Sequence, residues 1–105
     1  MSYDLWLTID TGGPEPAVVA DIGNMTSNVA PMWRLAGADL AKFHGKKAAD
    51  CLPALVSAVG DMAAHPAKYE ALNPPNGWGD QKECLRYLTD ALAAFERHPL
   101  ATVEV

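Results

Sequence analysis

This chain lacks any run of charge of one sign. Its eight basic residues form no stripe that could follow a nucleic-acid backbone, and its thirteen acidic residues lie singly between Asp4 and Glu104. The formal net charge of -5 is mild for a protein of 105 residues. Because proteins that bind nucleic acid carry a basic patch or stripe, we expect no direct nucleic-acid binding.

Long hydrophobic runs are also missing. No apolar stretch approaches the roughly 18 residues that a membrane-spanning helix needs. The opening residues 1–4 show no basic segment followed by an apolar core of the kind that directs secretion. The sequence therefore predicts a cytoplasmic protein that makes no membrane contact.

Cysteine and histidine are sparse and widely spaced. Cys51 and Cys84 fall on the apolar faces of predicted helices, so we expect two buried, reduced thiols, with a disulfide between the helices as the alternative. His44, His65 and His98 have no second ligand at metal-binding spacing on one element, so no metal site is predicted. The sequence also has no phosphate-cradling glycine loop and no nucleophile elbow. We therefore predict no cofactor, and the sequence favours a non-enzymatic protein over an enzyme.

The patterns that are present fit one domain spanning residues 1–105. Half of the residues are apolar and 20% are charged, which is ordinary for a globular protein. Residues 3–10 alternate apolar and polar side chains and predict a half-buried strand, followed by a Gly- and Pro-rich turn at 11–16. Residues 17–22 suit the returning strand and 100–105 a third strand. We expect these strands to pair antiparallel.

Helical periodicity occupies the middle of the chain. A short helix is predicted around 32–36, with Pro31 in its first turn. Either Ser27 or Asn28 is its expected N-cap, and Gly37 marks its end.

Two longer helices follow. The first is predicted over 46–64, kinked at Pro53 and not starting there, because the apolar stripe passes through the proline without changing phase. One more helical turn is expected through 69–72. The last helix begins at the N-cap Asp80, with Glu83 three residues on. Its predicted buried face comprises Cys84, Leu85, Leu88, Ala91, Leu92 and Phe95.

These elements predict an α+β fold. A small antiparallel sheet, made of an N-terminal hairpin and a C-terminal strand, packs against two long helices and one or two short ones. The two long helical patterns also align with each other, with Cys51 on Cys84 and His65 on His98. Such an offset is typical of helical repeats. However, two amphipathic helices aligned on their apolar stripes match in this way without any duplication.

Two polar stretches, 21–28 and 73–80, separate these elements where neither a helix nor a strand is expected to continue. Turn and capping interactions within each stretch are the simplest explanation of their polar side chains. The alternative is a small-ligand pocket formed where the stretches meet. Its candidate residues are Asp21, Asn24, Thr26, Asn28, Asn76 and Asp80.

Two tryptophans need a separate explanation. Trp6 lies on the polar face of the first strand, so either a helix covers that face or an exposed aromatic marks an interface. Trp78, between two glycines, either plugs the edge of the core or contacts a ligand or partner.

Residues 21–32, DIGNMTSNVAPM, together with residues 73–80, NPPNGWGD, resemble a family of small uncharacterised proteins encoded by tailed phages of actinobacteria. The similarity extends over nearly the whole chain in the order of its elements. This family has no established activity, so the resemblance assigns no catalytic role to any residue. It implies a non-virion phage protein acting in the host cytoplasm, where small phage proteins often bind a host or phage component.

The main functional hypothesis is a non-enzymatic interaction protein that binds a host or phage protein. Its binding surface would include Trp6, Trp78 or the two polar stretches. The alternatives are a small-molecule binder or enzyme with a pocket between 21–28 and 73–80, and a structural or assembly component. The sequence leaves the partner and the oligomeric state open.

Overall fold

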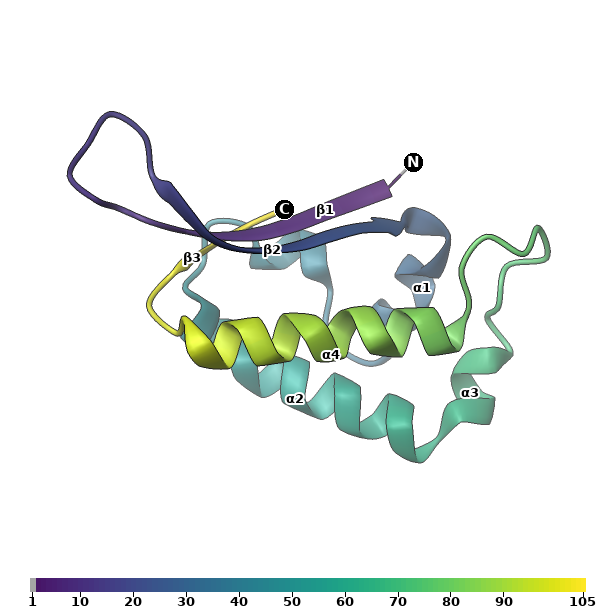
Figure 1. The fold of residues 1–105 in the computed structure, drawn as a ribbon. Coiled ribbons are helices and arrows are strands. Elements are labelled where there is room, and N and C mark those ends of the chain that lie inside the picture. The colour runs from purple at the N-terminus through teal and green to yellow at the C-terminus, as the bar shows by residue number, and fades with distance from the viewer. Residues whose placement is uncertain (1) are drawn as a thin grey trace.

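The computed structural model describes residues 2–105 and confirms the α+β architecture, with the helices gathered on one face of the sheet (Figure 1). Strands β1 (Ser2–Ile9), β2 (Ala17–Thr26) and β3 (Thr102–Glu104) form an antiparallel sheet in the order β2-β1-β3. The predicted hairpin and C-terminal strand are therefore both present, and β1 is the central strand.

Strand β2 is longer than the sequence predicts. Residues 21–26, which we expected to form a loop, continue the strand and pair with the first half of β1, from Asp21 opposite Trp6 to Thr26 opposite Ser2. The prediction that no strand continues through this stretch was wrong. The physical reason is that β2 is an edge strand, where polar side chains are tolerated and two register shifts in its pairing with β1 absorb extra residues.

The helical elements follow the predicted order with two additions, the short 3-10 helices η1 (Ser27–Val29) and η2 (Leu40–Phe43). The others are α1 (Ala30–Leu35), α2 (Ala48–Ala64), α3 (Pro66–Glu70) and α4 (Gln81–Arg97). Neither 3-10 helix was predicted from the sequence, which indicated a polar loop at residues 27 and 28. Pro53 lies inside α2, which confirms that the helix passes through the proline.

The predicted helix caps are confirmed at one helix and wrong at another. Asp80 caps α4 as expected, since its Oδ1 accepts a hydrogen bond from the Glu83 backbone N–H at 2.8 Å. At α1 the N-cap is Val29, because the 3-10 turn η1 precedes the helix. Thr26 begins that turn, and its hydroxyl oxygen accepts a hydrogen bond from the Asn28 backbone N–H at 3.3 Å. Gly37 follows α1 with a φ of 92°, a left-handed conformation that favours glycine.

The core lies between the sheet and the pair formed by α2 and α4. Leu5 and Leu7 of β1 are fully buried, as are Leu55 of α2 and Leu88 of α4. Cys51 and Cys84 are buried free thiols, as predicted, and form no disulfide with each other. Burial raises the pKa of Cys84 to about 12, which makes that thiol a poor nucleophile at neutral pH. Within residues 2–105, no helix is both long and apolar enough to cross a membrane.

Candidate functional site

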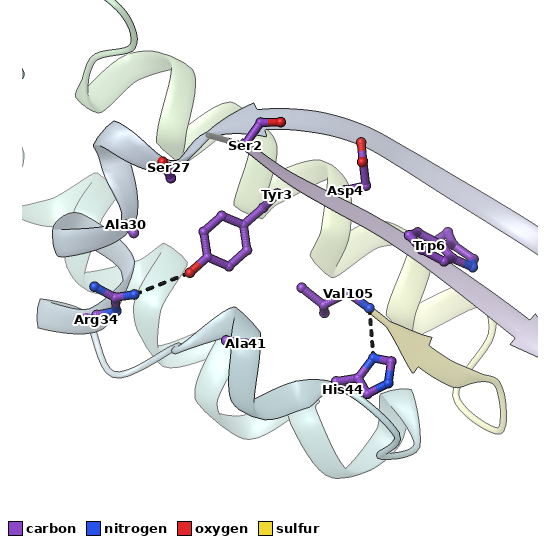
Figure 2. Close-up of a pocket in the computed structure, with 10 residues that line it drawn as sticks. All are labelled: Ser2, Tyr3, Asp4, Trp6, Ser27, Ala30, Arg34, Ala41, His44 and Val105. Atoms are coloured by element: carbon purple, nitrogen blue, oxygen red, sulfur yellow. Dashed lines mark hydrogen bonds between the residues drawn. The ribbon is translucent and has the colours of Figure 1, made fainter.

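A cleft of about 860 Å³ lies beside the N-terminal half of β1 (Figure 2). One wall is β1 itself, and the other is formed by α1, η2 and the segment that follows η2. The residues that line the cleft include Tyr3, Asp4, Trp6, Arg34, Ala41 and His44. Four separate parts of the chain therefore meet around one concavity.

The cleft lies beside the part of β1 that β3 does not reach. The three residues of β3 pair only with Trp6, Leu7 and Thr8 of β1. From Ser2 to Leu5, β1 has β2 on one side and, in the described part of the chain, no strand on the other. An open strand edge thus borders the cleft.

The inner wall of the cleft is held by an aromatic pair and an arginine. The Tyr3 ring packs edge-on against the fully buried Trp33, with 4.9 Å between centroids and an interplanar angle of 83°. Arg34 Nη2 donates a hydrogen bond to the Tyr3 hydroxyl at 3.2 Å, and Arg34 Nε lies 3.9 Å from Asp39 Oδ1. The guanidinium is oriented by these two neighbours while about half of its side chain stays exposed.

The far end of the cleft is marked by His44. Its Nδ1 accepts a hydrogen bond from the Val105 backbone N–H at 3.1 Å and lies 3.9 Å from Glu104 Oε2. An accepting Nδ1 places the proton of the neutral ring on Nε2. The imidazole thereby ties the end of β3 to the segment after η2 (Figure 2).

The cleft offers binding groups of several kinds. It combines open backbone positions, the aromatic side chains of Tyr3 and Trp6, and the cation of Arg34. The carboxylate of Asp4 is not free for a ligand in the same way, because it accepts a hydrogen bond from Asn24 Nδ2 at 3.1 Å. Among residues 2–105, no group of three or more His, Cys, Asp and Glu side chains is placed to hold a metal ion. This arrangement suits a peptide-like ligand that has both polar and apolar groups.

Of the residues predicted from sequence to form a site, Trp6 lines this cleft. Trp6 alternates along β1 with the fully buried Leu5 and Leu7, so its half-buried side chain lies on the face of the strand away from the helices. Trp78 does not plug the core, because 71% of its surface is exposed. Its backbone N–H donates to Asn76 Oδ1 at 3.0 Å, a turn that presents the indole to solvent.

The polar candidates mostly make local bonds. Asp21 Oδ1 accepts a hydrogen bond from the Gly23 backbone N–H at 2.9 Å, inside β2. Asp80 caps α4, and Asn76 accepts a hydrogen bond within the α3–α4 loop. Asn24 instead reaches across to β1, where its Nδ2 donates a hydrogen bond to Asp4 Oδ1. A cavity of about 250 Å³ beside Asp80 includes no residue of 21–28.

The two polar stretches nevertheless touch each other at one glycine. A Cβ added to Gly79 would lie 2.7 Å from Thr26 Cγ2 and 2.8 Å from Val29 Cγ1, and the φ of Gly79 is +89°. Both the contact and the backbone conformation require glycine here. The contact fastens the loop that carries Trp78 to the segment that leads into α1.

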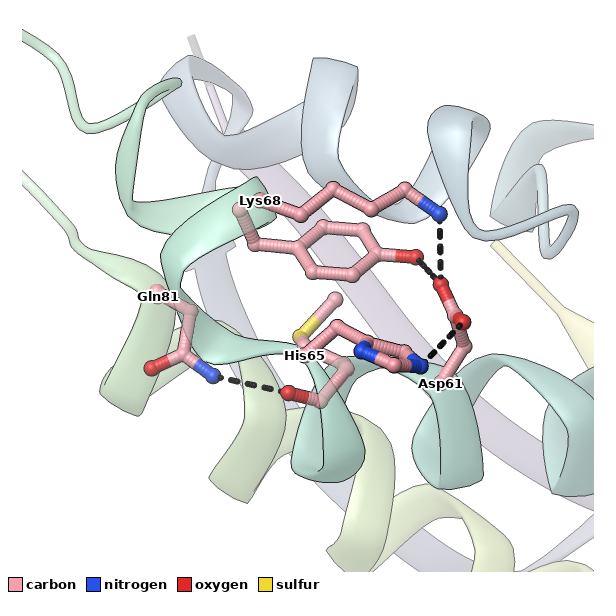
Figure 3. A network of polar contacts seen from close by, with 6 residues as sticks. Asp61, His65, Lys68 and Gln81 are labelled. Carbon is pink, nitrogen blue, oxygen red and sulfur yellow. Dashed lines mark hydrogen bonds and ion pairs between the residues drawn. The ribbon is translucent and has the colours of Figure 1, made fainter.

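A second polar cluster joins α2 to α3 (Figure 3). Asp61 Oδ2 accepts a hydrogen bond from Lys68 Nζ at 2.8 Å and another from the Tyr69 hydroxyl, and His65 Nε2 lies 4.0 Å from Asp61 Oδ1. The hydrogen bonds from Lys68 and Tyr69 lower the pKa of Asp61, and the same pairing raises the pKa of Lys68. Nearby, Gln81 Nε2 donates to the Met62 carbonyl at 3.3 Å.

Sequence reasoning missed both this cluster and the inner wall of the cleft. The cluster had a weak signal, since Asp61 and His65 are one helical turn apart at the end of a predicted helix. Tyr3 and Arg34 had none, because the contact between them joins residues on separate elements. Their position became visible only when the fold was known.

Comparison with protein-family models, with curated proteins and with solved structures finds no match to this chain. The resemblance to phage proteins therefore stays a prediction, and any proposal about function depends on the geometry of the cleft.

Proposed function

We propose that this protein is a non-enzymatic interaction protein that binds another protein through the cleft beside β1. The main support for this proposal is that Trp6 lines a cleft bordered by the half of β1 that, within residues 2–105, pairs with β2 on one edge and with no strand on the other. From the sequence resemblance, we further propose that the protein acts in the host cytoplasm and that its partner is a host or phage protein.

The composition of the cleft supports protein recognition. Tryptophan, tyrosine and arginine are the residues that most often dominate binding energy at protein interfaces. Trp6, Tyr3 and Arg34 line the same cleft. Because Trp33 and Arg34 already orient the Tyr3 side chain, little conformational freedom is lost there on binding.

A second contact is available at the same end of the molecule. The α3–α4 loop, which carries the exposed Trp78, projects at the end where the N-terminal half of β1 lies (Figure 1). Gly79 packs on Thr26 and Val29, and Ser27 and Ala30, next to them in sequence, line the cleft. A partner seated in the cleft and extending past η1 would reach Trp78.

The experiment uses immobilised wild-type protein and three variants to capture proteins from an extract of the native host. The variants are Trp6→Ala, Trp78→Ala and the control Leu100→Ala, which removes an exposed apolar side chain that does not line the cleft. We expect one partner that wild type and Leu100→Ala retain and Trp6→Ala loses. Circular dichroism checks that each variant is folded.

The captured partner is then purified and titrated directly against each variant. We expect Trp6→Ala to weaken binding by about tenfold or more, since removal of a hot-spot side chain costs about 2 kcal/mol. Trp78→Ala should have a smaller effect. Equal affinities for wild type and Trp6→Ala would show that the cleft is not the binding surface.

A further inference from the structure

We infer that the partner binds by strand addition: an extended segment of the partner protein lies in the cleft, antiparallel to β1, and pairs with the open edge at Ser2 and Asp4. This inference rests on the proposed function and specifies its binding mode. It follows from the direction of backbone groups, the course of β3 and the side chains on either face of the edge.

Backbone hydrogen bonds of β3 show which of its residues face β1. Val103 donates its N–H to the Lys46 carbonyl and accepts from the Gly45 N–H, both at 2.8 Å, on the side of β3 away from β1. Since successive residues of a strand direct their backbone groups to opposite edges, Thr102 and Glu104 direct theirs toward β1. Their partners on β1 are Thr8 and Trp6.

The same alternation along β1 identifies the open groups. Thr8 and Trp6 face β3, so Asp4 and Ser2 direct their N–H and C=O groups to the same edge. The register shifts do not disturb this order, because the extra residues, Val19 and Ile22, belong to β2. The backbone groups of Ser2 and Asp4 therefore point into the cleft, where no described strand pairs with them.

The course of β3 shows that the cleft has room for a strand. β3 runs between β1 and the segment 45–47 and is bonded on both sides, including a bridge between Lys47 and Thr102. The cleft continues that line past Val105, between β1 and the wall made by α1 and η2 (Figure 2). An added strand would thus extend the course that β3 already follows.

An extended segment fits this edge better than a helix or a flat surface does. An unpaired edge presents alternating donors and acceptors at the spacing of a strand, and strand addition is a recurring mode of peptide recognition. Side chains on the inner face of the added strand would meet Tyr3, Ala30 and Ala41, and those on the outer face would lie beside Trp6. The partner segment therefore has apolar residues at alternate positions.

The probe is a linear peptide selected from a displayed random library on the immobilised protein and then synthesised. Two variants at one position separate backbone from side-chain effects. Asp4→Ala and Asp4→Pro both remove the carboxylate that accepts from Asn24, but only the proline removes the N–H that faces the cleft. Thermal unfolding of both variants checks that the sheet is retained.

We expect Asp4→Ala to bind the peptide within about twofold of wild type and Asp4→Pro to bind at least about tenfold more weakly. N-methylation of the peptide, which removes one backbone N–H at a time, should weaken binding at alternate positions only. Trp6→Ala should also weaken binding of the unmethylated peptide.

Each contrary result has a distinct meaning. If Trp6→Ala abolishes peptide binding while Asp4→Pro and every N-methylated peptide bind normally, strand addition is wrong and the proposed function stands. The inference is also overturned if the library yields no peptide, or only peptides whose affinity is the same for wild type and for every cleft variant. The separate titration with the captured partner then decides the proposed function. Self-association in light scattering that Asp4→Pro abolishes would identify a second copy as the occupant and contradict the inference.

Discussion

Helices α2 and α4 bury corresponding positions but differ in their exposed faces and in the side-chain interactions at their ends. Both have 17 residues, and their bounds stand at the same separation, from Ala48 to Gln81 and from Ala64 to Arg97. The buried positions of α2 that have a buried counterpart in α4 are Ala48, Cys51, Leu55, Ala58 and Met62; the counterparts are Gln81, Cys84, Leu88, Ala91 and Phe95. The alignment seen in the sequence is therefore an alignment of buried stripes.

The exposed faces of the two helices contrast strongly. On α2 the exposed residues are mainly small or apolar: Ala49, Pro53, Val56, Ser57, Gly60, Ala63 and Ala64. On α4 most of them are charged: Lys82, Glu83, Arg86, Asp90, Glu96 and Arg97. The periodicity of buried residues is therefore enough to place both helices against the core, whatever the charge of their outer faces.

The ends differ too. α4 begins with the side-chain cap of Asp80, whereas Lys47, the N-cap of α2, makes no side-chain hydrogen bond to its helix. α2 ends in the cluster around Asp61, and the corresponding position of α4 is the buried Ala94. Local interactions therefore support α4 at its start and α2 at its end.

The largest expected effect tests the shared stripe. Leu55→Ala and Leu88→Ala each remove a fully buried side chain at corresponding positions, and each should lower the free energy of unfolding by about 2 to 5 kcal/mol. Urea denaturation of the two variants measures this. A large loss at only one of them would show that the two stripes are not equivalent in the core.

The next effect separates the helix starts. Asp80→Ala removes the acceptor for the Glu83 backbone N–H and should cost about 1 kcal/mol of stability. Lys47→Ala, at the N-cap of α2, should change stability by less than about 0.5 kcal/mol. Equal losses in urea denaturation would mean that Asp80 does not act as a cap in solution.

A smaller effect concerns the end of α2. Hydrogen bonds from Lys68 and Tyr69 lower the folded-state pKa of Asp61, so the folded state takes up a proton less readily than the unfolded chain. Its stabilising contribution is present above the unfolded value of about 3.9 and is lost as the pH falls through the lowered folded value. We expect Asp61→Asn to be less stable than wild type at pH 7.

Thermal unfolding from neutral pH to about pH 3 measures this contribution, and the difference between Asp61→Asn and wild type should narrow below about pH 4. Lys68→Met, which removes the ion pair but keeps the Tyr69 hydrogen bond, should give a smaller loss at neutral pH. A difference that stays constant across this range would contradict the assignment.

The smallest effects are expected on the outer faces. Val56 on α2 and Thr89 on α4 occupy corresponding exposed positions. Val56→Lys and Thr89→Lys should each change stability by no more than about 0.5 kcal/mol, as measured by urea denaturation. A large loss of stability for Val56→Lys alone would mean that this face of α2 is covered in solution and is not an exposed counterpart of the outer face of α4.

Much of the fold was predictable because its signals are local. The alternation of β1, the stripe that runs through Pro53, and the Asp80 cap each involve residues within a few positions of one another. The extent of β2 was not predictable in this way, because its polar residues 21–26 look like a loop until β1 is placed beside them. These residues form a strand because of their position at the edge of the sheet, and their residue types alone do not predict it.

The candidate site was predictable only at one residue. Trp6 stood out because a large aromatic side chain lay on a polar strand face. Its neighbours in the cleft could not be found, because Arg34 and His44 are far from Trp6 in sequence and carry no motif. The polar stretches attracted attention for their composition, yet most of their side chains bond locally.

By itself, the sequence determined the order and type of the main elements, the buried thiols and the stripes of α2 and α4, because periodicity and capping act within one element. Only the tertiary structure decided that β3 pairs with Trp6, Leu7 and Thr8, and that, within residues 2–105, the N-terminal half of β1 has no strand at the edge beside α1 and η2. Strand pairing depends on where distant segments meet, and that information is spread over the whole core.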